Sequence, residues 1–446
     1  MWWIKLLQLI ACLSILVIVH EMGHFLFAKL FKCRVEKFYL FFNPWFSIFK
    51  FRIGETEYGL GWIPFGGYVK ISGMIDESMD TEALKEPPKP YEFRSKPAWQ
   101  RLLIMVGGVL MNLLLAAIIY ISMSFSYGET YISAKDAKYG FEFSPLAEEI
   151  GFRDGDMLLT VDGAPVDNYI TAYKSLLLDS PSYMEVDRGG ETVRVYISEE
   201  YIPRMLKDKE FLAPRIPFVV SEVQAGGPAD KAGIKAGDAI VGIDSLQGVF
   251  MSDVFNILEA NKSRTLTFTV NRDSAGFVQT VSILVEVTSN GKIEVWLTPA
   301  AELIDFSTRK YTFAEAIPAG FRRAGNEIRD YWKQLKMLVK PETEAYKSVG
   351  GVIAIGNIFP DTWSWARFWD LTAIISIMLA VINILPIPAL DGGHVMFLLY
   401  EVIPRRKPSD KFLERAQLVG LFILFAILIY ANGNDIVKLV QKWLAN

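Results

Sequence analysis

The sequence predicts a polytopic α-helical membrane protein that carries a large soluble α+β insert. Hydrophobic residues make up 51% of the 446 residues and the mean hydropathy is +0.25, values too apolar for an ordinary soluble enzyme. Charged residues still account for 22% of the chain, so part of it must lie in water. The net charge of -4 is too small to indicate a nucleic-acid partner.

Four apolar stretches predict the transmembrane helices, since crossing a bilayer takes roughly 20 apolar residues. They cover residues 3–31, residues 101–126, a stretch from Leu371 that is interrupted by two prolines, and residues 416–432. The third stretch could instead be a buried helix of a soluble domain. Its length and its position beside the fourth stretch favour a membrane span.

Basic residues near the ends of these stretches predict the orientation of the chain. They cluster after the first stretch, before the second, and between the third and the fourth: Lys29, Lys32, Arg34, Lys37, Arg94, Lys96, Arg101, Arg405, Arg406, Lys407, Lys411 and Arg415. These loops are therefore expected in the cytoplasm. Both chain ends and the insert 127–366 then face the outside.

Two of the three histidines lie inside the first apolar stretch, where ionisable groups are costly and indicate a functional site. His20-Glu21-Met22-Gly23-His24 is an H-E-x-x-H motif. On a helix the two histidines share one face, so both imidazoles can bind one metal ion. Glu21 follows directly and can take a proton from the attacking water.

Asp391 is the candidate for a third metal ligand, since a catalytic zinc usually has three protein ligands. An unpaired carboxylate at membrane depth would be costly, and zinc would neutralise it. Nearby Pro386, Pro388 and the Gly392-Gly393 pair interrupt the helix, and irregular backbone is tolerated where it lines a polar cavity. Two alternatives remain open: Asp391 lies in a wet loop near the cytoplasmic face, or His394 is the ligand.

The soluble insert contains an internal repeat. Residues 144–163 match residues 227–245, with Pro145, Gly151 and Gly155-Asp156 aligned to Pro228, Gly233 and Gly237-Asp238. Each copy predicts a short helix, a glycine turn and an apolar strand. The repeat resembles the P-A-x-x-A-G-(I/L)-x-x-G-D segment of bacterial PDZ domains, and the spacing suits two such domains in tandem.

An amphipathic helix is predicted over residues 311–340. Its apolar positions are Phe313, Ile317, Phe321, Ile328, Trp332, Leu335 and Leu338, set against Arg322, Arg323, Arg329, Lys333 and Lys336. This pattern is typical of a helix that lies on a membrane surface, here the outer one. A plain interdomain helix is the alternative.

The two motifs together resemble the site-2 protease family of intramembrane zinc metalloproteases. The second motif is N-x-x-P-x-P-x-L-D-G, which runs from Asn383 to Gly392. The resemblance implies that His20, His24 and Asp391 bind Zn²⁺, that Glu21 is the catalytic base, and that Asn383 contacts the substrate or stabilises the transition state. The family's second helix often carries G-P-x-x-N; here Gly108-Val109-Leu110-Met111-Asn112 lacks the proline.

The resemblance also implies a β-sheet that dips into the membrane from the cytoplasmic side. Residues 56–73 fit a strand, a turn at Pro64 and Gly66-Gly67, and a second strand. A transmembrane substrate must unwind before water can attack it, and an exposed strand edge could hold the unwound segment by backbone pairing. The substrate-binding candidates are Tyr68, Val69, Lys70, Ile71 and Asn383. The alternative is an ordinary cytoplasmic hairpin.

The complete prediction is a four-helix membrane protein with a membrane-dipping β-sheet and two extracytoplasmic PDZ-like α+β domains. Its expected segments are a helix with H-E-x-x-H (1–32), a cytoplasmic or re-entrant β region (33–100), a second helix (101–126), PDZ-like domains (127–212 and 213–300), amphipathic surface helices (301–366), a third helix broken at its motif (367–403), and a cytoplasmic loop, fourth helix and tail (404–446).

The predicted activity is that of a zinc endopeptidase in the inner (cytoplasmic) membrane, acting in regulated intramembrane proteolysis during a stress response. Its substrates would be single-span membrane proteins already trimmed outside by an upstream site-1-type protease, such as anti-sigma factors or remnant signal peptides. Two rivals are a non-proteolytic scaffold that binds partners through its PDZ-like domains and a zinc-dependent transporter.

Overall fold

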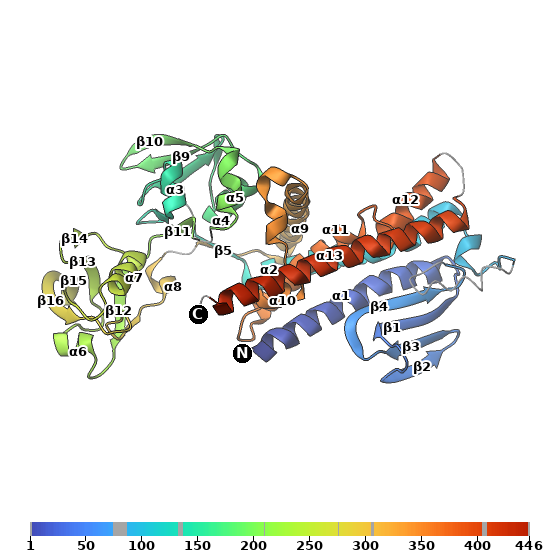
Figure 1. Cartoon of the computed structure of the whole chain (residues 1–446), viewed down its shortest axis with the longest axis horizontal. Helices are drawn as coiled ribbons and strands as arrows, with labels where there is room; N and C mark the ends of the chain where they lie inside the picture. The colour runs from blue at the N-terminus through green and yellow to red at the C-terminus, as the bar shows by residue number, and fades with distance from the viewer. Residues whose placement is uncertain are drawn as a thin grey trace. The chain divides into compact units, whose positions relative to one another are not determined.

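The computed structural model describes residues 2–74, 87–132, 137–208, 210–274, 276–304, 307–403 and 408–444. The chain forms two compact units (Figure 1). One combines residues 1–129 with residues 310–446, and the other spans residues 130–309.

The first unit is built on long apolar helices. Four helices in the described part of the chain are long and apolar enough to cross a membrane: α1 (Trp2–Leu30), α2 (Ala98–Tyr127), α11 (Trp365–Asn383) and α13 (Asp410–Leu444). This confirms the prediction of a polytopic membrane protein. α2 packs along both α1 and α11 (Figure 1).

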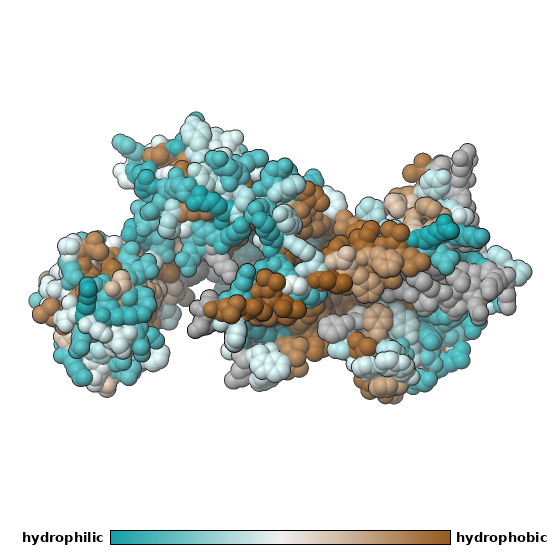
Figure 2. Space-filling model, in the orientation of Figure 1, coloured by the Kyte–Doolittle hydropathy of each residue, from teal (hydrophilic) through white to brown (hydrophobic). Residues whose placement is uncertain are grey.

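The burial of these helices shows which surface a bilayer would cover. Half of the most apolar window of α2 is buried in the protein, against 11% for α13. The exposed side chains of α13 include Phe422, Phe425 and Ile429. Hydrophobic residues accordingly gather on the surface over α13 (Figure 2).

The third apolar stretch is divided as its prolines predict. α11 ends at Asn383, and α12 (Asp391–Val402) begins after a loop that contains Pro386 and Pro388. Ala389 in this loop has a φ of 80°, a left-handed conformation that is strained for a residue with a side chain. The loop makes Asp391 the first residue of α12.

A four-stranded sheet follows α1, in the order β2-β3-β1-β4. The strands are β1 (Val35–Phe42), β2 (Phe49–Ile53), β3 (Thr56–Leu60) and β4 (Ile63–Ile71). β1 pairs with β3 in parallel and with β4 in antiparallel orientation. β4 is therefore an edge strand, and it packs against α1.

The predicted hairpin over residues 56–73 is wrong. β3 and β4 flank β1 and are not paired with each other. The pairing of β1 with β4 jumps from Leu40–Gly67 to Phe42–Ile63, so the segment Pro64–Gly66 forms a bulge inside β4. Gly66 has a φ of 88°. Proline and glycine here bend a strand, which is their usual role inside a sheet, and do not make a turn.

The amphipathic helix is α9 (Phe313–Leu338), which begins with a capping box of Thr312 and Glu315. Its small residues Ala316, Ala319, Gly320 and Ala324 are buried, and the helix packs against α2 and α11. An ion pair of 2.5 Å joins Arg323 to Asp370 of α11. Phe313 and Phe321 remain 62% and 55% exposed, so α9 also keeps an apolar face open. α10 (Val352–Asn357) precedes α11.

The second unit contains two α/β copies. The first has the sheet order β10-β9-β7-β8 and a separate β11-β6 pair, and the second has the order β16-β15-β13-β12-β17, with β14 paired to β13. The elements of the first copy are β6 (Phe141–Phe143), α3 (Pro145–Ile150), β7 (Met157–Val161), β8 (Ala164–Pro165), α4 (Tyr169–Leu178), β9 (Tyr183–Arg188), β10 (Glu191–Tyr196), α5 (Ile202–Met205) and β11 (Leu212–Pro214).

The elements of the second copy repeat this plan around an apolar core that includes Phe218 and Phe268. They are β12 (Phe218–Val223), α6 (Pro228–Ala232), β13 (Ala239–Ile243), β14 (Leu246–Gln247), α7 (Met251–Ala260), β15 (Thr265–Ser274), β16 (Phe277–Glu286) and β17 (Val295–Leu297). Short elements at the ends of the unit are β5 (Glu129–Tyr131), α8 (Ala300–Leu303) and β18 (Ser307–Arg309), and β5 pairs with β18.

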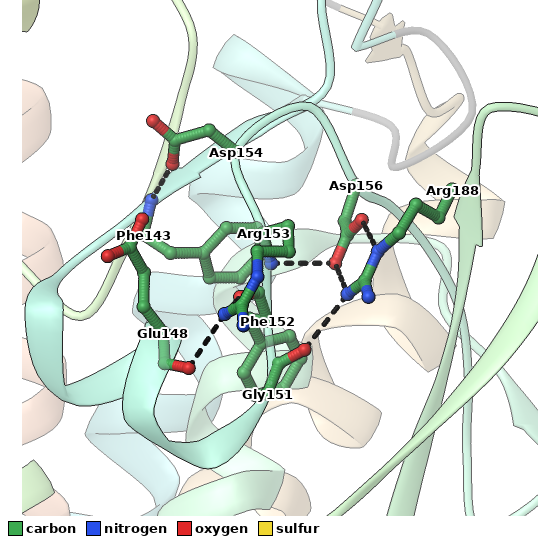
Figure 3. A network of polar contacts seen from close by, with 8 residues as sticks. All are labelled: Phe143, Glu148, Gly151, Phe152, Arg153, Asp154, Asp156 and Arg188. Atoms are coloured by element: carbon green, nitrogen blue, oxygen red, sulfur yellow. Dashed lines mark hydrogen bonds and ion pairs between the residues drawn. The ribbon is translucent and has the colours of Figure 1, made fainter.

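The repeated Gly-Asp pair is the anchor of a buried ion pair in each copy. In the first, Arg188 donates to both oxygens of Asp156, at 2.8 and 2.7 Å, and to the carbonyl of Gly151 at 2.9 Å (Figure 3). The backbone N–H of Arg153 donates to the same carboxylate at 2.9 Å. Asp156 is only 1% exposed, so its charge requires these partners.

The second copy reproduces the arrangement. Arg272 donates to Asp238 at 2.7 and 2.6 Å and to the carbonyl of Gly233 at 2.9 Å, and the N–H of Lys235 donates at 2.8 Å. Burial raises the pKa of Asp238, but the hydrogen bonds from Arg272 and Lys235 outweigh it and hold that pKa below its usual value. In each copy the aspartate therefore ties the glycine turn before it to the strand that carries the arginine.

Candidate metal centre

His20 and His24 project from one face of α1 toward Asp391 at the start of α12. The two Nε2 atoms lie 3.3 Å apart. Asp391 Oδ2 lies 3.2 Å from His20 Nε2 and 3.4 Å from His24 Nε2. The three ligand atoms all fall within 4.8 Å of one another, and both histidines are buried. The structure thus brings together the three residues that the sequence singled out.

The donor set fits zinc. Asp391 Oδ2 is buried and has no hydrogen-bond partner among the described residues, although it faces two imidazole nitrogens. Two imidazole nitrogens and one carboxylate oxygen that converge on a point are a known catalytic zinc ligand set, which leaves a fourth position for water or substrate. A divalent cation at this point would satisfy all three atoms.

α2 forms the wall behind the two histidines. A Cβ atom on Gly108 would lie 2.5 Å from His24 Nε2 and 2.6 Å from His20 Cε1, so only glycine lets α2 come this close. His24 Nδ1 lies 2.8 Å from the carbonyl oxygen of Ile104, which accepts the hydrogen of that nitrogen. Such a bond to the outer nitrogen fixes the ring and leaves Nε2 free for a metal.

Glu21 connects the centre to the edge strand. Its carboxylate interacts electrostatically with His24, His20 and Asp391, and it accepts a hydrogen bond from the backbone N–H of Val69 in β4. A Cβ atom on Gly67 would lie 2.6 Å from Val17, so β4 runs directly against α1 here. Because the Val69 N–H points at Glu21, the outer edge of β4 faces the side of α1 that carries this glutamate.

The other residues of β4 have different surroundings. The Tyr68 hydroxyl donates to Asn43 at 2.9 Å, and its ring stacks on Tyr39 at 5.3 Å. Lys70 pairs with Glu36 at 3.8 Å. Ile71 is 3% exposed in an apolar core. Of the four predicted β4 residues, Val69 has a contact with the centre.

The structure places Asn383 beside the centre and His394 away from it. Asn383, the last residue of α11, places Nδ2 3.4 Å from His20 Nε2, beside the centre. His394 Nε2 instead lies 3.1 Å from Nε2 of Gln417 on α13. The group of three ligands contains Asp391 and not His394, so the geometry favours the aspartate between the two alternatives.

Sequence reasoning did not find the parts that α2 supplies. Gly108 and Asn112 stood in the G-x-x-x-N stretch, but their contacts with the histidines depend on how two helices cross. The Ile104 carbonyl is a backbone group, which no residue type identifies. The arginines that hold Asp156 and Asp238 were missed as well, since each lies on a later strand, Arg188 on β9 and Arg272 on β15, far from its aspartate in the sequence.

An H-E-x-x-H helix and a carboxylate that meet inside apolar, membrane-length helices define a class of protein, the membrane-embedded zinc metalloproteases. The model of peptidase family M50 matches residues 8–427. The chain belongs to this family.

Relatives match over nearly the full length. A protein of Neisseria meningitidis named "Putative zinc metalloprotease" is 29% identical, over 98% of this chain and 99% of its own. Proteins with the same description from Borreliella burgdorferi and Clostridium perfringens are 27% and 26% identical, over 97% and 95% of this chain and 98% and 96% of theirs. The chain is therefore a zinc metalloprotease of the site-2 protease type.

Proposed function

We propose that this chain is an intramembrane zinc endopeptidase that hydrolyses peptide bonds within the transmembrane segments of single-span membrane proteins. The observation that carries the proposal is the position of the metal centre. His20, His24 and Asp391 meet on helices that are apolar enough to cross a membrane, so a substrate has to reach them within the bilayer.

The proposed roles follow from the contacts. His20, His24 and Asp391 hold the zinc ion, which when bound polarises the scissile carbonyl and the attacking water. Glu21 takes one proton from the water as its oxygen bonds to the carbonyl carbon. Glu21 then gives that proton to the amide nitrogen as the C–N bond breaks, which releases an amine and a carboxylic acid that keeps the second proton of the water until it ionises. The Val69 N–H orients the Glu21 carboxylate throughout.

Asn383 is proposed to stabilise the transition state. Its amide nitrogen lies beside His20, and an amide N–H placed there can donate to the carbonyl oxygen as negative charge builds on it. This role needs a donor, so Asn383→Asp should lower kcat more than it changes zinc affinity. Equal turnover of Asn383→Asp and the unmodified enzyme would contradict it.

The edge of β4 is proposed to hold the unwound substrate by strand addition. It is an edge strand whose outer side faces Glu21, which is where an added strand would present a peptide bond. The far side of the same sheet is exposed and apolar: Trp45 is 90% exposed, and Phe49 and Phe51 are 58% and 45% exposed. We propose that this surface dips into the membrane, as the resemblance implied.

Cross-linking tests the edge strand. In the background of Glu21→Gln, which should bind substrate without cutting it, Lys70→Cys lies on β4 and Arg52→Cys lies on β2 at the opposite edge. The two native cysteines are buried. A substrate with a cysteine near its cut site should form a disulfide with position 70 and not with position 52. Equal cross-linking at both positions would contradict strand addition at β4.

The proposed layout keeps the segment boundaries and the orientation predicted from the sequence, with PDZ-like domains outside the inner membrane. The basic residues beside the apolar helices support this orientation. Arg405, Arg406 and Lys407 of the cytoplasmic loop lie outside the described residues. The substrates would be trimmed outside by a site-1-type protease before they enter, as anti-sigma factors and remnant signal peptides would be.

The second unit is proposed to act as a size filter, which excludes substrates with bulky outer domains. The competing account is that each PDZ-like copy captures a new C-terminus by strand addition. Deleting 130–309 with a short linker should let the enzyme cut untrimmed substrates while the rate on trimmed ones changes little. Slower cutting of trimmed substrates, with untrimmed ones still intact, would favour capture.

Glu21→Gln tests the enzyme against the scaffold alternative. Glutamine keeps the shape of the side chain but cannot accept the proton, so cleavage should stop while zinc stays bound. Glu414→Gln, the same change at an exposed position on α13, is the control and should cleave normally. Normal cleavage by Glu21→Gln would show that Glu21 is not the base, and a scaffold role would predict that Glu21 is dispensable in cells.

A further inference from the structure

Asn112 lies on α2 directly behind His20 and has no role in the mechanism above. It is 0% exposed, and its Nδ2 lies 3.3 Å from His20 Nδ1. Its other amide atom, Oδ1, is buried without a hydrogen-bond partner among the described residues. A polar side chain buried inside a membrane-spanning bundle and aimed at a metal ligand calls for a physical explanation.

The chemistry of His20 decides which end of the amide must face it. His20 Nε2 is the nitrogen that points to Asp391 and His24, so it needs a free lone pair to bind zinc. In a neutral imidazole the hydrogen is then on Nδ1, which needs an acceptor. An amide nitrogen offers only hydrogens. A half-turn of the amide exchanges its nitrogen and oxygen, so hydrogen bonding decides which of the two atoms faces His20. Because His20 Nδ1 needs an acceptor, the flipped amide, with Oδ1 against His20 Nδ1, is the orientation that fits.

His24 has the same kind of hydrogen bond at Nδ1, and there the identity of the acceptor is certain. Its Nδ1 lies 2.8 Å from the Ile104 carbonyl oxygen, which can only accept. Ile104 and Asn112 lie on the same helix, so α2 supplies an acceptor to each of the two histidines. The difference is that one acceptor is backbone and the other is a side chain, which substitution can remove.

We propose that Asn112 is a positioning residue for zinc: its Oδ1 accepts the Nδ1 hydrogen of His20 and so keeps His20 Nε2 free and directed at the metal. The Asn112 backbone makes a separate contact that does not involve the side-chain amide, since the Ser376 hydroxyl on α11 donates to the Asn112 backbone carbonyl at 2.8 Å. The inference rests on the proposed metal centre, but it concerns zinc binding and not the cleavage reaction.

Three variants of the full-length protein in detergent test the assignment by zinc affinity, measured by competition with a chelator and without substrate. Asn112→Leu removes the acceptor while keeping a side chain branched at Cγ and should weaken zinc binding about 10- to 100-fold. Asn112→Asp keeps an acceptor and cannot donate, so it should bind zinc as tightly as the unmodified protein or more tightly. Ser376→Ala removes only the contact with the backbone and should bind normally.

The same experiment separates the alternatives. Loss of zinc affinity in both Asn112→Leu and Asn112→Asp would show that the amide donates, which overturns the proposal. Unchanged affinity in Asn112→Leu would overturn it too, while leaving the proposed protease intact. Conversely, a protein that follows the predicted order of zinc affinities but cuts no membrane substrate would retain this inference and contradict the proposed function.

Nitrogen-15 NMR distinguishes the proposed hydrogen bond from a purely structural role of Asn112, because it reports which nitrogen of His20 carries the hydrogen. The chain has only three histidines, so labelling histidine gives few signals to assign. In the metal-free protein His20 should carry its hydrogen on Nδ1, and Asn112→Leu should move it to a mixture of the two nitrogens, with the His24 signals unchanged. A hydrogen on Nε2 of His20 in the unmodified protein would overturn the proposal.

Discussion

Gly108→Ala tests how closely α2 must approach the metal centre. The added methyl carbon would lie 2.5 Å from His24 Nε2 and 2.6 Å from His20 Cε1, whereas ordinary contact begins at 3.4 Å. Both rings would therefore have to retreat by almost 1 Å. Metal–ligand distances tolerate changes of about 0.2 Å, so the two nitrogens could no longer bind one ion together with Asp391. We expect zinc affinity to fall at least about 100-fold.

The assay is chelator competition on the purified protein, with helix content followed by circular dichroism. Turnover of a membrane peptide should fall by a similar factor, because a displacement of 1 Å costs about 100-fold in rate. Gly433→Ala on α13 is the matched control, since a Cβ atom there meets nothing within 4 Å. A folded Gly108→Ala protein with unchanged zinc affinity would refute the placement of α2 behind the histidines.

Three other predictions concern the ligand set and the second unit. Asp391→Asn should lower zinc occupancy measured by atomic emission, because a neutral amide is a poor ligand, whereas His394→Ala should leave it full; full occupancy in Asp391→Asn would count against the aspartate. Arg272→Met should destabilise the unit 130–309 by about 2–3 kcal/mol, since it leaves a buried carboxylate without its partner, and an unchanged melting temperature would contradict this. The folded-state pKa of Asp238 is lowered, so its stabilisation is complete above the unfolded value of about 3.9 and is lost as the pH falls through the folded pKa. Thermal scans at acidic pH should show this loss in the unmodified protein and a smaller one in Arg272→Met.

The sequence predicted best those features that depend on neighbouring residues. Hydropathy alone located the four membrane-length helices, and the i, i+4 spacing of His20 and His24 placed both imidazoles on one face. Asp391 is distant in sequence, yet it was found because a carboxylate among apolar residues demands a partner. In each case the physical constraint is local or strong enough to leave few alternatives.

What the sequence did not predict depends on how distant segments meet. Pro64 and Gly66 were read as a turn because these residues favour turns, but pairing of β4 with β1 makes the same residues a bulge. The acceptor of His24 is the carbonyl of Ile104, a group that every residue possesses. The contact of Glu21 with the Val69 N–H likewise required the sheet to be placed against α1.

The most direct test of the account is to reconstitute the purified protein in liposomes with a single-span peptide and to locate any cut by mass spectrometry. The account predicts a cut within the membrane-spanning part of the peptide, which stops when zinc is chelated, returns when zinc is added back, and is absent in Glu21→Gln with zinc still bound. A cut confined to residues outside the bilayer, or one that Glu21→Gln makes at the normal rate, would contradict it.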